Sequence, residues 1–117
     1  MKLRPDQLDL FAGAREDAFV TATARMLQRR YAPRLEAHGL AGDKTESFVR
    51  ESADRARRYD VLNEADIRMF CECRLLLGLK FDAEPWAREI LTTADVDGET
   101  KMNMLDERLL FTREEPT

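Results

Sequence analysis

The segment that decides the fold is YDVLNEADIRMFCECRLLLGLKFDAEPWAREIL, residues 59–91. Between Asn63 and Gly78, apolar residues fall on nearly every side of a predicted helix. A helix that is apolar around most of its circumference has to be surrounded by other helices. The segment therefore predicts a buried central helix from Asn63 to about Leu79.

Both ends of this predicted helix carry local signals. Asn63 followed by Asp66 is typical of an N-cap, and acidic residues in the first turn suit the helix dipole. Gly78 either ends the helix or allows a neighbouring element to approach closely. Its polar interruptions are Arg68, Glu72 and Arg74.

Two further helices are predicted downstream. Asp82 or Glu84 is expected to cap the first of them, which has Pro85 in its first turn. The residues of this helix expected to face inward are Trp86, Ile90 and Leu91. Residues 95–98 predict a turn, and a last helix is expected over about 99–111.

Upstream, residues 5–12 and 14–31 predict helix, with Gly13 either separating two helices or lying within one. Pro33 predicts a kink or break, because proline disfavours helix at the residue before it. The helix is expected to resume as far as His38, where Gly39 and Leu40 predict a Schellman ending.

The next helix is predicted to begin at Asp43, with Glu46 as its capping partner, and to run to about Tyr59. The chain of 117 residues has 44% hydrophobic and 36% charged residues with few glycines and prolines. We therefore expect a single all-α domain over residues 1–117. It would be a compact bundle of five or six helices around the buried central helix, with residues 112–117 as a frayed tail.

The net charge of −4 argues against general affinity for nucleic acid or an anionic membrane, because phosphate binding requires clustered Lys and Arg. The chain contains no apolar run that approaches the roughly 20 residues of a transmembrane helix. The first residues, MKLRPDQLDLF, lack the apolar region of a signal peptide. A cytoplasmic location is therefore expected.

Carboxylates are plentiful, but histidine and cysteine are few. Cys71 and Cys73 are too close on a helix for a disulfide, and a separation of two directs their side chains roughly 200° apart. With His38 as the one histidine, the common zinc ligands are not complete. The string DVDGE at residues 95–99 matches only part of a calcium loop. We expect no catalytic, cofactor or metal site, although an acidic pair for hydrolysis stays open as an alternative.

The last predicted helix has more apolar positions than one buried face needs. Two methionines give such a surface adaptability, and exposed apolar patches usually mark association. Arg55, Arg57 and Arg58 form a small basic cluster that could dock an acidic partner. The residues predicted to bind a partner protein, or a second copy in a homodimer, are Met102, Met104, Leu109, Leu110, Phe111, Arg57 and Arg58.

Three segments occur in the order EDAFVTATARMLQRRY, RARRYDVLNEADIRMF and LLLGLKFDAEPWAREIL. This order, over about residues 14–93, resembles small all-helical accessory proteins encoded in bacterial type VI secretion and toxin-effector gene clusters. Asp60 stands where the family pattern has glycine or a similar turn residue. The residues that carry the resemblance are Tyr59, Asp66, Leu77, Gly78, Phe81, Asp82, Pro85, Trp86, Ala87, Ile90 and Leu91.

The resemblance implies an accessory role without an active site: an adaptor or chaperone that binds a toxin effector or a spike component before delivery. The alternative is a cytoplasmic immunity protein that occludes a toxin. A third hypothesis is a carboxylate-dependent hydrolase, which would require a deep pocket with converging acids of perturbed pKa.

Overall fold

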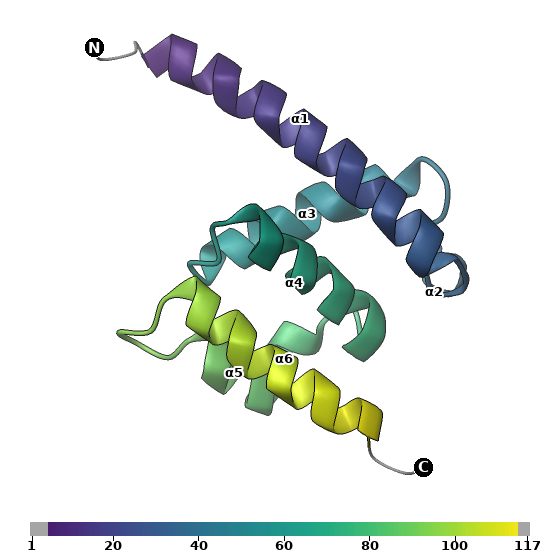
Figure 1. Cartoon of the computed structure of the whole chain (residues 1–117), viewed down its shortest axis with the longest axis vertical. Helices are drawn as coiled ribbons and strands as arrows, with labels where there is room; N and C mark the ends of the chain where they lie inside the picture. The colour runs from purple at the N-terminus through teal and green to yellow at the C-terminus, as the bar shows by residue number, and fades with distance from the viewer. Residues whose placement is uncertain (1–4, 115–117) are drawn as a thin grey trace. The chain divides into compact units, whose positions relative to one another are not determined.

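The computed structural model describes the backbone of residues 5–114 and the side chains of residues 13–108 (Figure 1). Six α-helices and one 3₁₀ helix occur in this part of the chain, and no strand does. The predicted all-α fold of five or six helices is confirmed. The elements are α1 (Pro5–Arg30), α2 (Ala32–Ala37), α3 (Lys44–Arg58), α4 (Glu64–Leu77), η1 (Phe81–Ala83), α5 (Pro85–Leu91) and α6 (Gly98–Glu114).

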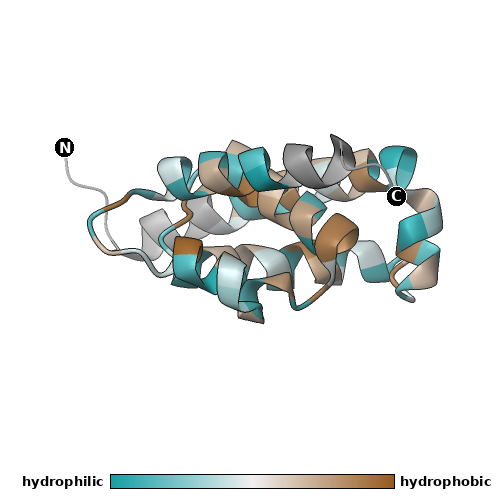
Figure 2. Ribbon diagram, turned by 90° about the horizontal axis from the view of Figure 1, so that it is seen from below, coloured by the Kyte–Doolittle hydropathy of each residue, from teal (hydrophilic) through white to brown (hydrophobic). Residues whose placement is uncertain are grey.

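The contacts divide the chain into two compact units, Met1–Val49 and Arg50–Thr117, and α3 contributes residues to both. Hydrophobic and hydrophilic residues are mixed along most helices, so burial depends on which face a residue occupies (Figure 2). The expectation of one domain over residues 1–117 stays a prediction.

In the first unit, α1 is one continuous helix that passes through Gly13. A glycine within a helix costs only about 0.5–1 kcal/mol relative to alanine, which a helix of 26 residues tolerates. The break expected near Pro33 occurs at Tyr31, and α2 follows with Leu35 buried. Helix α2 packs against α1.

The Schellman ending predicted for α2 is present. The N–H of Leu40 donates to the carbonyl of Leu35 at 2.7 Å, and the N–H of Gly39 donates to that of Glu36 at 3.0 Å. Gly39 has a φ of 70°, the left-handed conformation that glycine adopts without strain. This turn leads the chain towards α3.

In the second unit, α4 is the most deeply buried helix, as predicted. Its buried apolar residues are Ile67, Phe70, Cys71, Cys73 and Leu75. Helix α6 and η1 pack against α4, and α5 packs against both η1 and α6. Asn63 caps α4 by accepting a hydrogen bond from the N–H of Asp66 at 2.8 Å. The helix ends at Gly78, which has a φ of 127°.

The turn from α3 to α4 is built tightly. Asp60 has a φ of 64°, in the left-handed region, which aspartate adopts more readily than most residues. Val61 is fully buried behind it. Gly98, the first residue of α6, lies against the backbone of Asp60 and Val61 so closely that a Cβ atom would overlap the Asp60 carbonyl oxygen. The close approach accounts for the glycine at this position.

Candidate functional site

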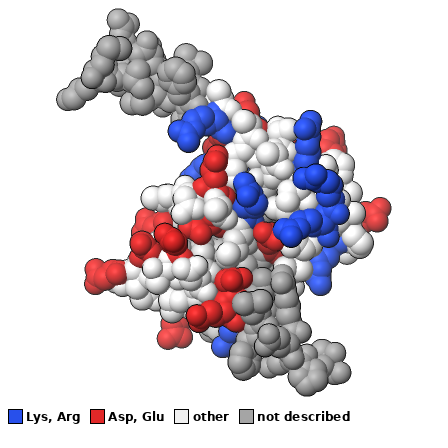
Figure 3. All heavy atoms as spheres, in the orientation of Figure 1, with Lys and Arg blue, Asp and Glu red and all other residues white. Residues whose placement is uncertain are grey.

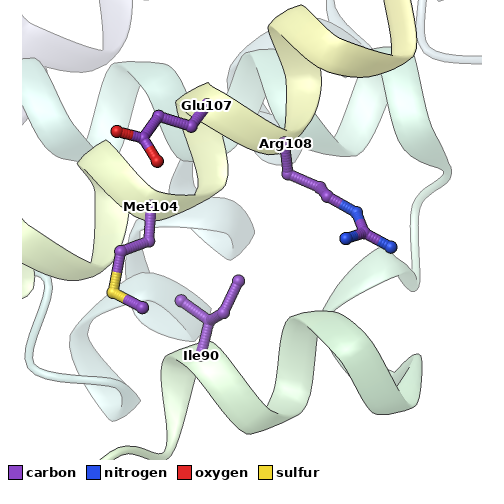
Figure 4. Close-up of a pocket in the computed structure, with 4 residues that line it drawn as sticks. All are labelled: Ile90, Met104, Glu107 and Arg108. Carbon is purple, nitrogen blue, oxygen red and sulfur yellow. The ribbon is translucent and has the colours of Figure 1, made fainter.

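A shallow groove between α5 and α6 is the candidate site. Ile90, Met104, Glu107 and Arg108 line a hollow of about 330 Å³ (Figure 4). Met104 reaches down from α6 and Ile90 reaches up from α5, so that the two apolar side chains point towards each other (Figure 4). Glu107 and Arg108 place opposite charges on the α6 side of the groove.

The two helices place these apolar residues at the edge of the core. On α5, Ala87 and Leu91 are buried, whereas Ile90, one position before Leu91, is half-buried. On α6, Leu105 is fully buried, whereas Met104 is 39% exposed. Each helix therefore packs one face into the core. The residue just before a buried leucine, Ile90 on α5 and Met104 on α6, keeps an apolar side chain in contact with water.

Trp86 lies beside this groove and is half-buried, so the prediction that it faces inward was only partly met. Its indole N–H donates a hydrogen bond to the Glu84 carboxylate at 3.0 Å. The Arg108 guanidinium lies 5.2 Å from the centre of the indole ring, within the range of a cation–π contact. The outer edge of the ring is thus part of the protein surface.

The structure separates the residues that were predicted to bind a partner. Met104 lines the groove, but Met102 is fully buried and belongs to the core, because it lies on the inner face of α6. Arg57 and Arg58 are exposed on α3 and are not part of the described groove lining. The side chains of Leu109, Leu110 and Phe111 lie outside the described residues.

A buried polar cluster around Asp82 was not predicted. Asp82 is 3% exposed, and its two carboxylate oxygens accept hydrogen bonds from Nε and Nη2 of Arg55, each at 3.3 Å. The Tyr59 hydroxyl donates to the same carboxylate at 2.9 Å. Burial, followed by the hydrogen bond to Asp82, raises the pKa of Tyr59. Asp82 therefore ties η1 to α3, and Glu84 takes the N-cap position of α5.

Arg74 forms a second buried cluster. Although the sequence placed it among the polar interruptions of α4, it is 3% exposed. Its guanidinium donates to the Leu79 carbonyl at 2.9 Å, the Ser52 hydroxyl at 2.8 Å and the Glu51 carboxylate at 3.0 Å. The charge of Arg74 can be buried because each of the three guanidinium nitrogens donates to an acceptor. The cluster joins α3 to the end of α4.

The other residues that the sequence suggested for chemistry, Cys71 and Asp97, are explained by burial or by local hydrogen bonds. Burial raises the pKa of the Cys71 thiol to about 12, so it stays protonated at neutral pH and is a poor nucleophile or metal ligand. Asp97 accepts a hydrogen bond from the Thr100 N–H at 2.8 Å, and bonds from Thr100 lower its pKa. Among the described residues, no three His, Cys, Asp or Glu side chains are grouped so that they could hold a metal ion.

The chain has no significant match to a protein-family model, a curated protein or a solved structure. None of the described helices combines the length and the apolar content that crossing a bilayer requires. The site is therefore interpreted from its own geometry: two apolar side chains at a helix–helix groove, with an indole ring and two opposite charges at its edges.

Proposed function

We propose that this chain is a non-catalytic, cytoplasmic protein-binding module that holds a segment of its partner in the α5–α6 groove. The observation that carries the proposal is Met104, which is 39% exposed on a helix whose neighbouring Leu105 is fully buried. With half-buried Ile90 opposite it, Met104 leaves apolar surface in water that association would cover.

The groove has the properties of a site for an amphipathic helix. The thioether of Met104 is flexible and can adapt to different apolar side chains. Helices that dock in grooves do so through apolar residues at intervals of three and four, which would suit a shallow hollow between two helices. Glu107 and Arg108 at the edge would favour one orientation of a partner that carries both charges.

The class of partner follows from the resemblance to type VI secretion accessory proteins. In that role the chain is an adaptor or chaperone that binds a toxin effector or a spike component before delivery. A homodimer through α6 is the competing use of the same surface, and sedimentation velocity at increasing protein concentration separates the two.

The test is binding to the proteins encoded beside this gene, measured with purified components. We expect Met104→Asp to weaken binding at least about tenfold, because a carboxylate would be desolvated in the interface. Asn103→Asp is the matched control: it adds the same charge at the adjacent exposed position of α6. Equal affinity of the two variants would contradict the proposal.

The acidic excess of the second unit favours one alternative, a cytoplasmic immunity protein. Residues 50–117 contain 16 Asp and Glu against 11 Lys and Arg, whereas residues 1–49 contain 7 against 8. An acidic surface suits a toxin whose active site binds polyanions. Co-expression discriminates the two functions, because an immunity protein restores growth in the presence of the toxin and an adaptor supports export of the effector.

A further inference from the structure

Leu62 is the feature of the second unit that neither the core nor the α5–α6 groove explains. This side chain is 68% exposed, although it lies between two residues that are firmly held. Val61 before it is fully buried, and Asn63 after it caps α4 through the N–H of Asp66. The exposure of Leu62 therefore arises at an ordered turn.

The backbone under Leu62 is braced by α6. Gly98 packs directly on the carbonyl of Asp60 and the Cα of Val61. The Lys101 ammonium donates a hydrogen bond to the Tyr59 carbonyl at 3.0 Å. An apolar side chain presented from such a fixed backbone loses less conformational freedom on binding than one on a loose loop.

Leu62 lies in a hollow with an acidic rim. The hollow has a volume of about 230 Å³, and its described lining consists of Asp60, Leu62, Asn63, Asp97, Gly98 and Glu99. That lining contains three carboxylates and no Lys or Arg. Lys101, two residues after Glu99 in the chain, is 4% exposed, and its ammonium donates inward to the Tyr59 carbonyl.

The two segments that form the hollow lie in an acidic region of the surface. Figure 3 shows acidic side chains gathered at the left of the view, where the α3–α4 turn and the α5–α6 loop lie in Figure 1. A negative potential around an apolar anchor steers positively charged partners to it and disfavours negative ones.

We propose that Leu62 and its acidic hollow form a second docking surface, which binds a partner-protein segment that carries lysine or arginine beside an apolar side chain. The apolar side chain covers Leu62, and the cations lie over Asp60, Asp97 and Glu99. The surface is separate from the α5–α6 groove and stands whether or not the groove binds a partner.

The test uses the full-length protein and two short synthetic peptides, one with a Leu-Phe pair flanked by lysines and one with glutamates in place of the lysines. Amide chemical shifts and titration calorimetry measure where and how tightly each peptide binds. We expect the lysine peptide to shift the amides of residues 60–64 and 97–101, with an affinity that falls as salt is raised. The glutamate peptide is expected not to bind.

Two variants test the two halves of the surface. Leu62→Ser removes the apolar anchor, and Asp60→Asn with Glu99→Gln removes two charges; each is expected to weaken binding of the lysine peptide about tenfold. Asparagine tolerates the positive φ of residue 60 as aspartate does, so the turn is kept. Circular dichroism and urea unfolding would verify that both variants fold.

Met104→Asp is the control for the other surface, and it should leave binding of the lysine peptide unchanged. The proposal is overturned if Leu62→Ser binds the lysine peptide as well as the natural protein does, or if the shifts appear around Met104. Concentration-dependent self-association that Leu62→Ser abolishes would assign the hollow to a second copy of the chain and would also overturn it.

Discussion

The hydroxyl of Tyr59 donates a hydrogen bond to the carboxylate of Asp82 at 2.9 Å, and Arg55 holds the same carboxylate through two donors. These contacts join the end of α3 to η1, 23 residues further along the chain. Tyr59 also stacks at an angle on Phe70, whose ring centroid lies 5.2 Å from that of Phe81. The polar contacts join the end of α3 to η1, and the aromatic cluster adds α4 to them.

Removing either partner of this bond should destabilise the protein. We expect Asp82→Ala to lower the free energy of unfolding by about 1.5–3 kcal/mol, because Arg55 and the Tyr59 hydroxyl lose a charged acceptor in a mostly buried place. Tyr59→Phe should cost about 1–2 kcal/mol. Urea unfolding measures both. The control Arg57→Gln, at an exposed pair with Asp54, should change the value by less than about 0.5 kcal/mol; a cost for Tyr59→Phe no larger than that would contradict the assignment.

The different space around Gly98 and Gly13 predicts opposite effects on stability when each is replaced by alanine. Gly98→Ala should lower the free energy of unfolding by about 1–3 kcal/mol, because its Cβ would meet backbone atoms of Asp60 and Val61 that cannot rotate away. Gly13→Ala has open space around the new atom and should raise the stability of α1 by about 0.5–1 kcal/mol. Thermal unfolding of the two variants in parallel checks the contrast, and a neutral Gly98→Ala would refute it.

The position of Trp86 at the surface predicts a modest loss of stability on its removal. Trp86→Ala should cost about 1–2 kcal/mol, because the ring is half-buried and its cation–π contact with Arg108 adds little at an exposed site. Phe70→Ala, in the fully buried aromatic cluster, should cost about 3–5 kcal/mol. Equal losses in urea unfolding would mean that the tryptophan is part of the core after all.

The burial of Cys71 makes stability depend on alkaline pH. The ordinary pKa of 9.0 applies in the unfolded chain, and burial raises the pKa to about 12 in the folded protein. The contribution of the protonated Cys71 thiol to the free energy of unfolding is complete below about pH 9. It is lost as pH rises towards the folded pKa, because the unfolded chain releases the proton first. The free energy of unfolding should therefore fall by about 1.4 kcal/mol per pH unit over this window from this group.

Cys71→Ala isolates that dependence. Measured by urea unfolding in a reducing buffer at about pH 8 and about pH 10, the variant should lose less stability than the natural protein. The raised pKa of Tyr59 acts in both proteins and cancels in the comparison. Identical pH dependence of the two proteins would show that the Cys71 thiol is accessible to water.

Much of the fold could be predicted because the signals were local. Apolar residues on most sides of α4 predicted its burial, and the pairs Asn63–Asp66 and Gly39–Leu40 predicted helix ends that the structure confirms. Each of these depends on residues within a few positions of one another, so no knowledge of tertiary contacts was needed.

The clusters around Asp82 and Arg74 could not be predicted in the same way. Asp82 precedes a helix, where capping is the usual role of aspartate, and its actual partners Arg55 and Tyr59 are 27 and 23 residues away. Arg74 lies on the buried face of α4, four residues after Phe70, and its partners on α3 allow its charge to be placed there. Long-range pairing of charges leaves no periodic pattern in a sequence.

The exposed apolar residues could likewise be predicted only in part from the sequence. Sequence patterns identified Met104 because α6 has surplus apolar positions, but they grouped it with Met102, whose different rotation around the helix places it in the core. Leu62 was missed because a single apolar residue in a turn has no partner in a periodic pattern. The carboxylates of its hollow come from two turns, near Asp60 and Asp97, that only the folded chain brings together.

Both cysteines of the chain are fully enclosed by neighbouring side chains. A fluorophore that reacts with thiols would thus ignore the natural residues while the protein is folded, so no cysteine-free background has to be engineered. Leu62→Cys and Met104→Cys would each create one addressable thiol, and the dye attached there would report on the acidic hollow and on the groove independently.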